Sequence, residues 1–166
     1  MSAHSRLTSL HEDIEKSATR IQAGHPEWPC QKGCGSCCHQ LAEIPRITSI
    51  EWLLLYEGLK QLDQDALLEI QEKVSHWEPH IKGPLTCPFL DKTSESCRVY
   101  PYRPIACRTY GFFMDRGTGL FCKMIEERLF IQHEPPVVFG NQRSVELQMA
   151  QFGEQKPLTD WLATIF

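Results

Sequence analysis

Four of the eight cysteines in this chain fall within nine residues, in the run CQKGCGSCC. Thiolates are soft, anionic ligands, so cysteines at such short intervals indicate a metal site in a reducing compartment. We therefore expect the whole set to be metal ligands that staple an irregular region together. The set is Cys30, Cys34, Cys37, Cys38, Cys87, Cys97, Cys107 and Cys122.

The rest of the sequence favours a cytoplasmic location. The N-terminal segment MSAHSRLTSLHEDIEK has no apolar stretch of the kind found in secretory signals, and the longest apolar run, 52–56, is too short to span a membrane. Reduced thiols are therefore expected in place of four disulfides. The net charge of -4, with basic residues spread thinly, argues against non-specific nucleic-acid binding. A protein partner is expected, no membrane is, and the oligomeric state is open.

Hydrophobic spacing predicts several helices. A capping-box pattern at 48–51 predicts a helix that ends near Leu59, and Asp63 predicts the cap of a following helix, so that the two form a helical hairpin. Shorter helices are expected at 104–110, at 144–152 and after Pro157. A longer amphipathic helix is expected over 5–23, because apolar residues recur there every three or four positions, at Leu7, Leu10, Ile14, Ala18 and Ile21.

From Pro79 to Cys122 the chain has no helical period apart from the short turn after Pro104. We expect two β-hairpins in this segment, one with strands at 87–90 and 98–100 around the turn DKTSES, and one at 115–119. The fold class is therefore α-rich α+β, a small irregular metal-stapled single domain with a helical hairpin, flanking helices and short β-hairpins. That domain spans 1–166, with a cysteine-cluster core at 30–122 and helical flanks at 1–29 and 123–166.

The spacing leaves the metal open. Two tetrahedral zinc sites, one iron–sulfur cluster with one zinc, and one cluster with spare thiols all fit eight cysteines. A zinc ribbon fits poorly, because only 34–37 has the C-x₂-C form. The spacing C-x₃-C-x₂-C resembles that of radical S-adenosylmethionine enzymes, but a barrel of that class needs about 200 residues or more. Adjacent Cys37 and Cys38 point apart, so they serve different metal atoms or one of them is buried as an apolar residue.

Several residues close to the cysteines in the sequence also bear on the metal site. Gly33 and Gly35 let the backbone curl, which brings amide groups towards sulfur. Arg98, Arg103 and Arg108 either offset thiolate charge or hold an anionic substrate or partner, or else they are ordinary groups around the site and on the surface. His39 is expected to lie outside the ligand set.

Three stretches together resemble the bacterial YkgJ-like cysteine-cluster family, for which zinc or iron chelation by a CxxxCxxCC domain is proposed. They are CQKGCGSCC, CPFL and CRVYPYRPIACRTYG, and they span 30–122. The resemblance implies metal binding by the eight cysteines without a settled reaction. A similar cysteine domain is identified in flagellin lysine methylases, where an iron–sulfur cluster is implied. This chain lacks the glycine-rich turn after a strand that a methyl-donor site needs.

Three functions follow from these residues. We favour a metal-binding cysteine-cluster protein that carries an iron–sulfur cluster, of the 4Fe–4S type, for redox or accessory-to-modification chemistry. The alternative is a zinc-stapled structural or protein-interaction module without catalysis. A metal-exchanging sensor is the third, and eight thiolates are more than it needs. Whether the protein is an enzyme stays open, since no nucleophilic triad can be argued from the sequence.

Overall fold

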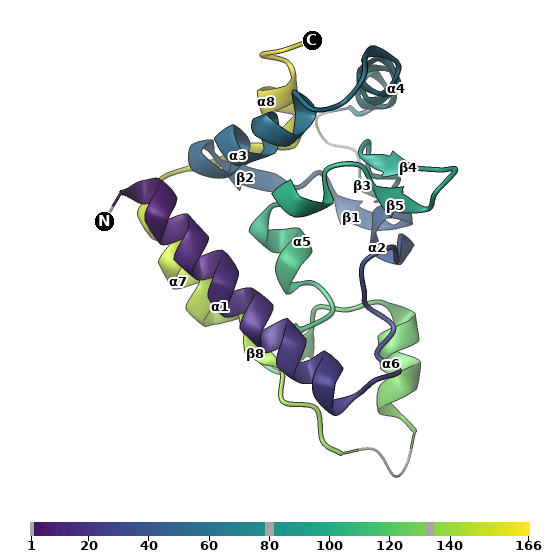
Figure 1. Cartoon of the computed structure of the whole chain (residues 1–166), viewed down its shortest axis with the longest axis vertical. Coiled ribbons are helices and arrows are strands. Elements are labelled where there is room, and N and C mark those ends of the chain that lie inside the picture. The colour runs from purple at the N-terminus through teal and green to yellow at the C-terminus, as the bar shows by residue number, and fades with distance from the viewer. Residues whose placement is uncertain (1, 79–81, 132–134) are drawn as a thin grey trace. The chain divides into compact units, whose positions relative to one another are not determined.

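The computed structural model describes residues 2–78, 82–131 and 135–166 (Figure 1). The chain packs into two units, and each unit combines two separate stretches of sequence. Unit 1 consists of Met1–Gln31 and Pro104–Gly153, and unit 2 consists of Lys32–Arg103 and Glu154–Phe166. The start of the irregular segment predicted from Pro79, at 79–81, lies outside the described residues.

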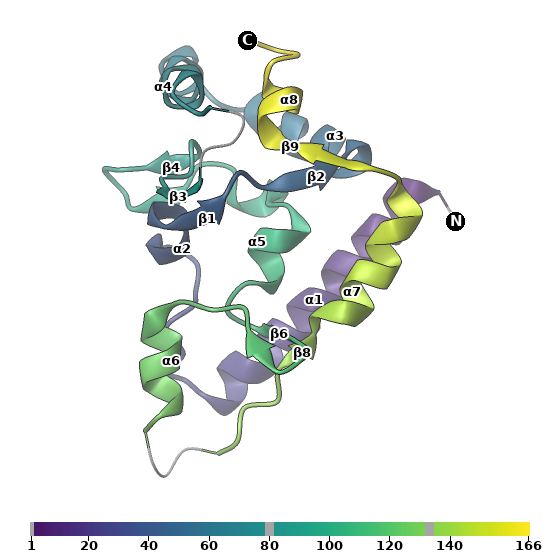
Figure 2. The ribbon, with the colours of Figure 1, turned by 180° about the vertical axis from the view of Figure 1, so that it is seen from behind.

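The described helices of unit 1 are α1 (Ala3–Gly24), α5 (Ile105–Thr109), α6 (Lys123–Leu129) and α7 (Gln142–Met149), the last continued by a 3-10 turn at Ala150–Phe152. One side of α1 is apolar and buried, because its apolar residues recur with the period of a helix. Helix α7 lies beside α1 in both ribbon views (Figures 1 and 2). The residues of α1 that face this packing are those predicted: Leu7, Leu10, Ile14, Ala18 and Ile21.

A small sheet in unit 1 contains β6 (Phe113–Asp115), β7 (Thr118–Gly119) and β8 (Gly140–Asn141). Strands β6 and β7 form the hairpin predicted at 115–119. Its turn residues Arg116 and Gly117 both have positive φ, 48° and 86°, as a tight hairpin turn requires. Strand β8 pairs in parallel with β6, which the sequence does not predict.

The described helices of unit 2 are α2 (Ser36–His39), α3 (Ser49–Leu59), α4 (Gln64–Ser75) and α8 (Leu158–Leu162), with a 3-10 turn at Tyr100–Tyr102. Thr48 and Glu51 form the predicted capping box at the start of α3. The Asp63 carboxylate accepts a hydrogen bond of 2.8 Å from the amide of Ala66 and so caps α4, as predicted. Helices α3 and α4 are joined by residues 60–63 and contribute Leu55 and Ile70 to one apolar core.

The strands of unit 2 are short antiparallel pairs: β1 (Leu41–Glu43) with β3 (Lys82–Leu85), β2 (Arg46–Thr48) with β9 (Gln155–Pro157), and β4 (Leu90–Asp91) with β5 (Ser96–Cys97). The indole of Trp161 stacks on that of Trp52 at 6.0 Å and donates a hydrogen bond to the carbonyl of Ile47. This contact fastens the C-terminal segment of unit 2 to the core.

The fold class is α-rich α+β, as predicted. The hairpin around DKTSES is present, but its strands are two residues long and closer to the turn than expected, since 87–89 and 98–99 are irregular. The chain divides into two packing units. That metal sites join it into one domain stays a prediction. Every helix in the described ranges is too short or too polar to cross a lipid bilayer.

Candidate metal centre

Three thiols of unit 2 hydrogen-bond to one another in series. Contrary to the expectation that adjacent Cys37 and Cys38 point apart, their thiols bond to each other, and that of Cys38 also bonds to that of Cys87. Cys37 and Cys38 lie in the single-turn helix α2, whereas Cys87 follows β3 and is buried. The early cysteine loop and the later cysteine segment therefore meet within unit 2.

Cys97 belongs to the same group. The negative charge of a Cys97 thiolate raises the pKa of the Cys38 thiol, and that of a Cys37 thiolate raises the pKa of Cys97. Strand β5 carries Cys97, and the amide of Val99 donates a hydrogen bond to its sulfur. An amide that points at sulfur stabilises a thiolate, and this is one way in which proteins tune metal–thiolate sites. We call Cys37, Cys38, Cys87 and Cys97 the unit 2 thiol group.

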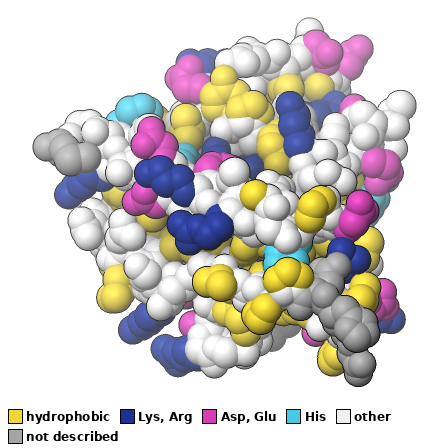
Figure 3. Space-filling model, turned by 60° about the horizontal axis from the view of Figure 1, so that its bottom comes forward, with side chains coloured by type: hydrophobic (Ala, Val, Ile, Leu, Met, Phe, Trp, Pro, Cys, Tyr) yellow, Lys and Arg dark blue, Asp and Glu magenta, His cyan; other side chains and the backbone are white. Residues whose placement is uncertain are grey.

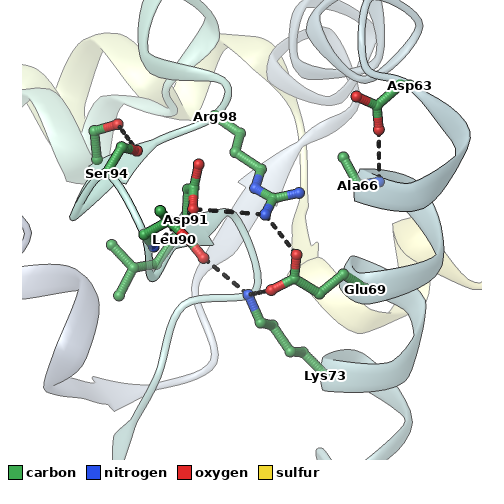
Figure 4. A network of polar contacts seen from close by, with 10 residues as sticks. Asp63, Ala66, Glu69, Lys73, Leu90, Asp91, Ser94 and Arg98 are labelled. Carbon is green, nitrogen blue, oxygen red and sulfur yellow. Dashed lines mark hydrogen bonds and ion pairs between the residues drawn. The ribbon is translucent and has the colours of Figure 1, made fainter.

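A network of charged side chains fixes the hairpin that carries Cys97 (Figure 4). Arg98 bonds to the carboxylate of Glu69 on α4 at 2.5 Å and lies 3.8 Å from the carboxylate of Asp91. Lys73 bonds to the other oxygen of Glu69 at 2.9 Å and donates a hydrogen bond of 2.8 Å to the carbonyl of Leu90. These contacts tie β4 and β5 to α4 and so set the position of the thiol next to Arg98.

In the metal-free protein the thiols of Cys37, Cys38 and Cys97 hold their protons. The hydrogen bond that the Cys37 thiol donates to Cys38, followed by burial, raises the pKa of Cys37 far above its usual range. The hydrogen bond with Cys37 lowers the pKa of Cys38, but the contact with Cys87 and burial outweigh it and raise that pKa to about 12. Burial raises the pKa of Cys97 as well. A metal ion binds thiolates, so it must displace these protons on binding.

Arg103 opposes these shifts. Its guanidinium lowers the pKa of both Cys37 and Cys97 and stacks on the ring of Tyr100 at 3.6 Å. Of the three arginines with two interpretations, this one therefore acts on the unit 2 thiol group. Arg98 and Arg108 instead bond to carboxylates, those of Glu69 and Glu15.

The glycines of the cysteine loop are required by its backbone conformation and packing. Gly33 has φ of 94°, and a Cβ on Gly35 would lie 2.8 Å from the carbonyl oxygen of Glu95, so neither position suits a side chain. The backbone amides that donate hydrogen bonds to sulfur are those of Cys37 and Val99, whereas the sequence suggested amides around Gly33 and Gly35. No sequence signal identifies Val99, because the bond depends on the β5 turn geometry.

The other three cysteines with a defined environment belong to unit 1. The thiol of Cys30 lies 3.8 Å from the carbonyl oxygen of Tyr110, to which it donates. Cys107 is in α5, and Cys122 is the N-cap residue of α6. Cys34 is half-buried and precedes α2 in the chain. All eight cysteines carry free thiols.

The unit 2 thiol group has the chemistry of ligands for a thiophilic metal, although its thiols are arranged for hydrogen bonding to one another. Within the described ranges, no three histidine, cysteine, aspartate or glutamate side chains are already placed to hold an ion. Four thiols in mutual contact or charge interaction are nevertheless the ligands that zinc and iron–sulfur clusters use. His39 is exposed and bonds to Glu95 at 2.5 Å.

A comparison with protein families bears on this donor set. Residues 29–135 match the model of a family named CxxCxxCC, with the description "Putative zinc- or iron-chelating domain". The chain belongs to the CxxCxxCC family. The match includes all eight cysteines and supports a metal-binding, cysteine-rich protein. Searches of curated proteins and of solved structures found no match to this CxxCxxCC protein.

Proposed function

We propose that this CxxCxxCC protein is a cytoplasmic iron–sulfur protein whose unit 2 thiol group holds a cluster of the 4Fe–4S type. The observation that carries the proposal is the hydrogen-bonded series of Cys37, Cys38 and Cys87, with Cys97 close enough for charge interaction. Such a cluster supplies one-electron redox chemistry when bound. The role proposed for the protein is redox chemistry or the support of a modifying enzyme.

The surroundings of the thiol group suit a negatively charged, thiolate-bound centre. Arg103 contributes a positive charge beside Cys37 and Cys97, and the Val99 amide contributes a fixed dipole at Cys97. Cys87 belongs to the apolar core of unit 2, and Cys38 and Cys97 pack against it. Limited solvent access and amide hydrogen bonds are the means by which a protein adjusts the potential of a cluster.

A zinc-stapled interaction module is the second candidate, and one surface observation favours it. Three consecutive apolar side chains remain exposed at the end of α6, namely Leu129 at 39%, Phe130 at 82% and Ile131 at 49%. Exposed apolar side chains that lie together mark protein-binding surfaces more often than other surface does. On the face drawn in Figure 3, basic side chains lie among acidic ones, which supports a protein partner over nucleic acid.

Analysis of protein purified without oxygen tests the proposal. We expect iron and acid-labile sulfide in equal amounts, together with a broad visible absorption that dithionite bleaches. The variant Cys97→Ser should lose most of this iron, while Ser96→Ala, a change at the neighbouring residue, should keep it. Zinc without sulfide, in protein that never met oxygen, would contradict the iron–sulfur proposal and favour the interaction module.

A further inference from the structure

We propose that unit 1 binds a small aromatic phosphate, meaning a phosphate monoester on a planar ring, in a hollow at the start of helix α7. The proposal goes beyond the proposed function and does not rest on it, because the residues that carry it include no cysteine. The hollow measures about 440 Å³ and is bounded by the β6–β7 turn, strand β8, the segment before β8 and the first turn of α7 (Figure 2). Ligand pockets in proteins span about 300–1,000 Å³, so a ligand of mononucleotide size has room here.

Two arginines give the hollow its charge. Arg116 and Arg143 are the only charged residues among the described ones that line it. They come from different elements, Arg116 from the β6–β7 turn and Arg143 from the first turn of α7. A phosphate monoester carries a charge of about −1.5 to −2 at pH 7 and three acceptor oxygens. Two guanidinium groups match such a group in charge and in hydrogen-bond donors.

The carboxylates beside these arginines hold them only weakly. The guanidinium of Arg143 lies 3.3 Å from the carboxylate of Glu146, in an exposed pair on one helix. That of Arg116 lies 3.9 Å from the carboxylate of Asp115, which is beyond hydrogen-bond distance. Exposed pairs of this kind contribute little, because water screens them. A phosphate dianion in the hollow therefore competes well for both guanidinium groups.

The backbone at Arg116 is unusual for an arginine. Its φ of 48° lies in the left-handed region, which favours Gly, Asn and Asp. Two-residue hairpin turns of this type are filled more often by Asn-Gly or Asp-Gly. This chain has the glycine, Gly117, but carries arginine before it, at the edge of the hollow. Backbone conformations that are sparsely populated concentrate at ligand sites, so the arginine at this position supports a binding role.

A side-chain amide adds a further donor for the phosphate. The side-chain oxygen of Asn141 accepts a hydrogen bond of 3.4 Å from the amide of Ser144 and so caps α7. Asn141 also lines the hollow. Since its oxygen is used by the helix, its NH₂ group is the end that can donate to a phosphate oxygen.

Apolar side chains form the rest of the wall and favour a ring on the ligand. Phe139 is held by the ring of Phe121, at 5.4 Å between centroids, and by the indole of Trp28, at 6.0 Å. It lines the hollow and is half-buried, so part of its ring stays accessible to a ligand. Met114 and Val137 line the hollow as well. A planar ring packs on a fixed aromatic surface of this kind, which a bare phosphate does not use.

Calorimetric titration of the whole chain, as purified, tests the proposal. The probes are phenyl phosphate and adenosine monophosphate, and the partial ligands are inorganic phosphate and adenosine, each of which lacks one half. We expect both probes to bind with dissociation constants below about 1 mM, and both partial ligands to bind at least about tenfold more weakly. Arg116→Gln and Arg143→Gln should each lower the affinity for the probes by about tenfold. The matched control Arg20→Gln removes the same charge from α1, outside the hollow, and should change it by less than about twofold.

Two further variants separate direct contact from general charge. Glu146→Gln removes the carboxylate that competes for Arg143 and should raise the affinity by about threefold. Phe139→Leu should weaken the binding of phenyl phosphate and leave that of inorganic phosphate unchanged. Melting temperatures close to that of wild type show that the variants are folded.

The outcomes that overturn the proposal are distinct. If neither probe binds, or if Arg20→Gln lowers the affinity as much as Arg143→Gln does, the hollow is not the site. If inorganic phosphate binds as tightly as phenyl phosphate, the hollow takes simple anions and the aromatic ligand is wrong. Each of these results leaves the metal content of the protein, and with it the proposed function, unaffected.

Discussion

The backbone amide of Cys87 donates a hydrogen bond of 2.6 Å to the carbonyl oxygen of Cys38. This bond joins the end of the short helix α2 to the residue that follows the β1–β3 pair, so the two thiols are held together by main chain. The distance between Cys38 and Cys87 is therefore set by the fold before any metal binds. Preorganisation of this kind lowers the entropy that a metal must overcome to bring its ligands together.

Removal of metal should destabilise the protein without unfolding all of its helices. Cys87 lies in the apolar core of unit 2, and helices α3 and α4 are anchored there by Leu55 and Ile70, which are fully buried. We expect chelation to lower the free energy of unfolding by at least about 3 kcal/mol, and the melting temperature by roughly 6–12 °C. Calorimetry with far- and near-ultraviolet circular dichroism measures this. Unchanged near-ultraviolet spectra after complete metal removal would contradict it.

Replacement of Arg103 by glutamine should weaken metal binding. Its charge favours the thiolate forms of Cys37 and Cys97, so the variant Arg103→Gln leaves these thiols harder to deprotonate. We expect affinity, measured by competition with a chelator, to fall by about tenfold, which corresponds to about 1.4 kcal/mol. Arg103→Lys keeps the charge and serves as the control, with a smaller loss. Equal affinities for wild type and Arg103→Gln would show that the charge does not matter.

The variant Gly111→Ala should be much less stable than Gly117→Ala. Both glycines have positive φ, 91° and 86°, so both substitutions carry the same backbone strain of about 1 kcal/mol. Only the Cβ at position 111 would meet a neighbour, the sulfur of Cys30 at 2.7 Å, whereas position 117 has open space around it. We expect about 2 kcal/mol more destabilisation at 111. Urea unfolding of the two variants measures the difference, and equal effects at the two glycines would speak against the contact with Cys30.

The stability of metal-free protein should fall as the pH rises above 9. Unfolded cysteine thiols lose their protons near 9.0, while Cys38 in the folded protein keeps its proton up to a pKa of about 12. The folded state binds more protons in this range, so the free energy of unfolding decreases with pH there and is unaffected by these groups below it. Urea midpoints at about pH 8 and about pH 10.5 test this. Cys38→Ser should show a shallower decrease, and a midpoint that rises with pH would refute the shifted pKa.

Glu69 should matter more for stability than other glutamates that pair with lysine. Glu69→Gln removes the charge that holds both Arg98 and Lys73 (Figure 4), and we expect a loss of about 1 kcal/mol. The control Glu57→Gln breaks an exposed pair with Lys60 and should cost close to nothing. Chemical denaturation of the two variants provides the comparison. The idea fails if Glu57→Gln proves the more damaging change.

Local patterns in the sequence predicted the helices, because a helix depends on residues close to one another in the chain. The caps Thr48 and Asp63 and the apolar side of α1 are examples. Strand β2 shows the limit of such patterns, since it is held by β9, with Arg46 opposite Pro157. A strand of three residues has too little alternation to be recognised, and its partner lies more than a hundred residues away.

For the cysteines too, the sequence predicted the chemistry but not which residues lie together. Their number and spacing indicated a metal-binding protein, and the family match supports that conclusion. Packing places Cys30 in unit 1 and Cys37 in unit 2, a division that the spacing of the cysteines does not reveal. The partner thiols of Cys38 could not be read from the sequence, because the β1–β3 pairing that brings Cys87 to it is not visible as a local pattern.

Strand β9 and helix α8 come after every cysteine in the order of synthesis, although they belong to unit 2. On the ribosome, Cys37, Cys38, Cys87 and Cys97 therefore emerge while Ile47 and Trp52 still lack the segment that covers them. A nascent chain that binds metal at this stage does so before the C-terminal segment has covered the apolar core of unit 2. A fragment that stops after the last cysteine keeps every thiol and leaves unit 2 permanently in that state.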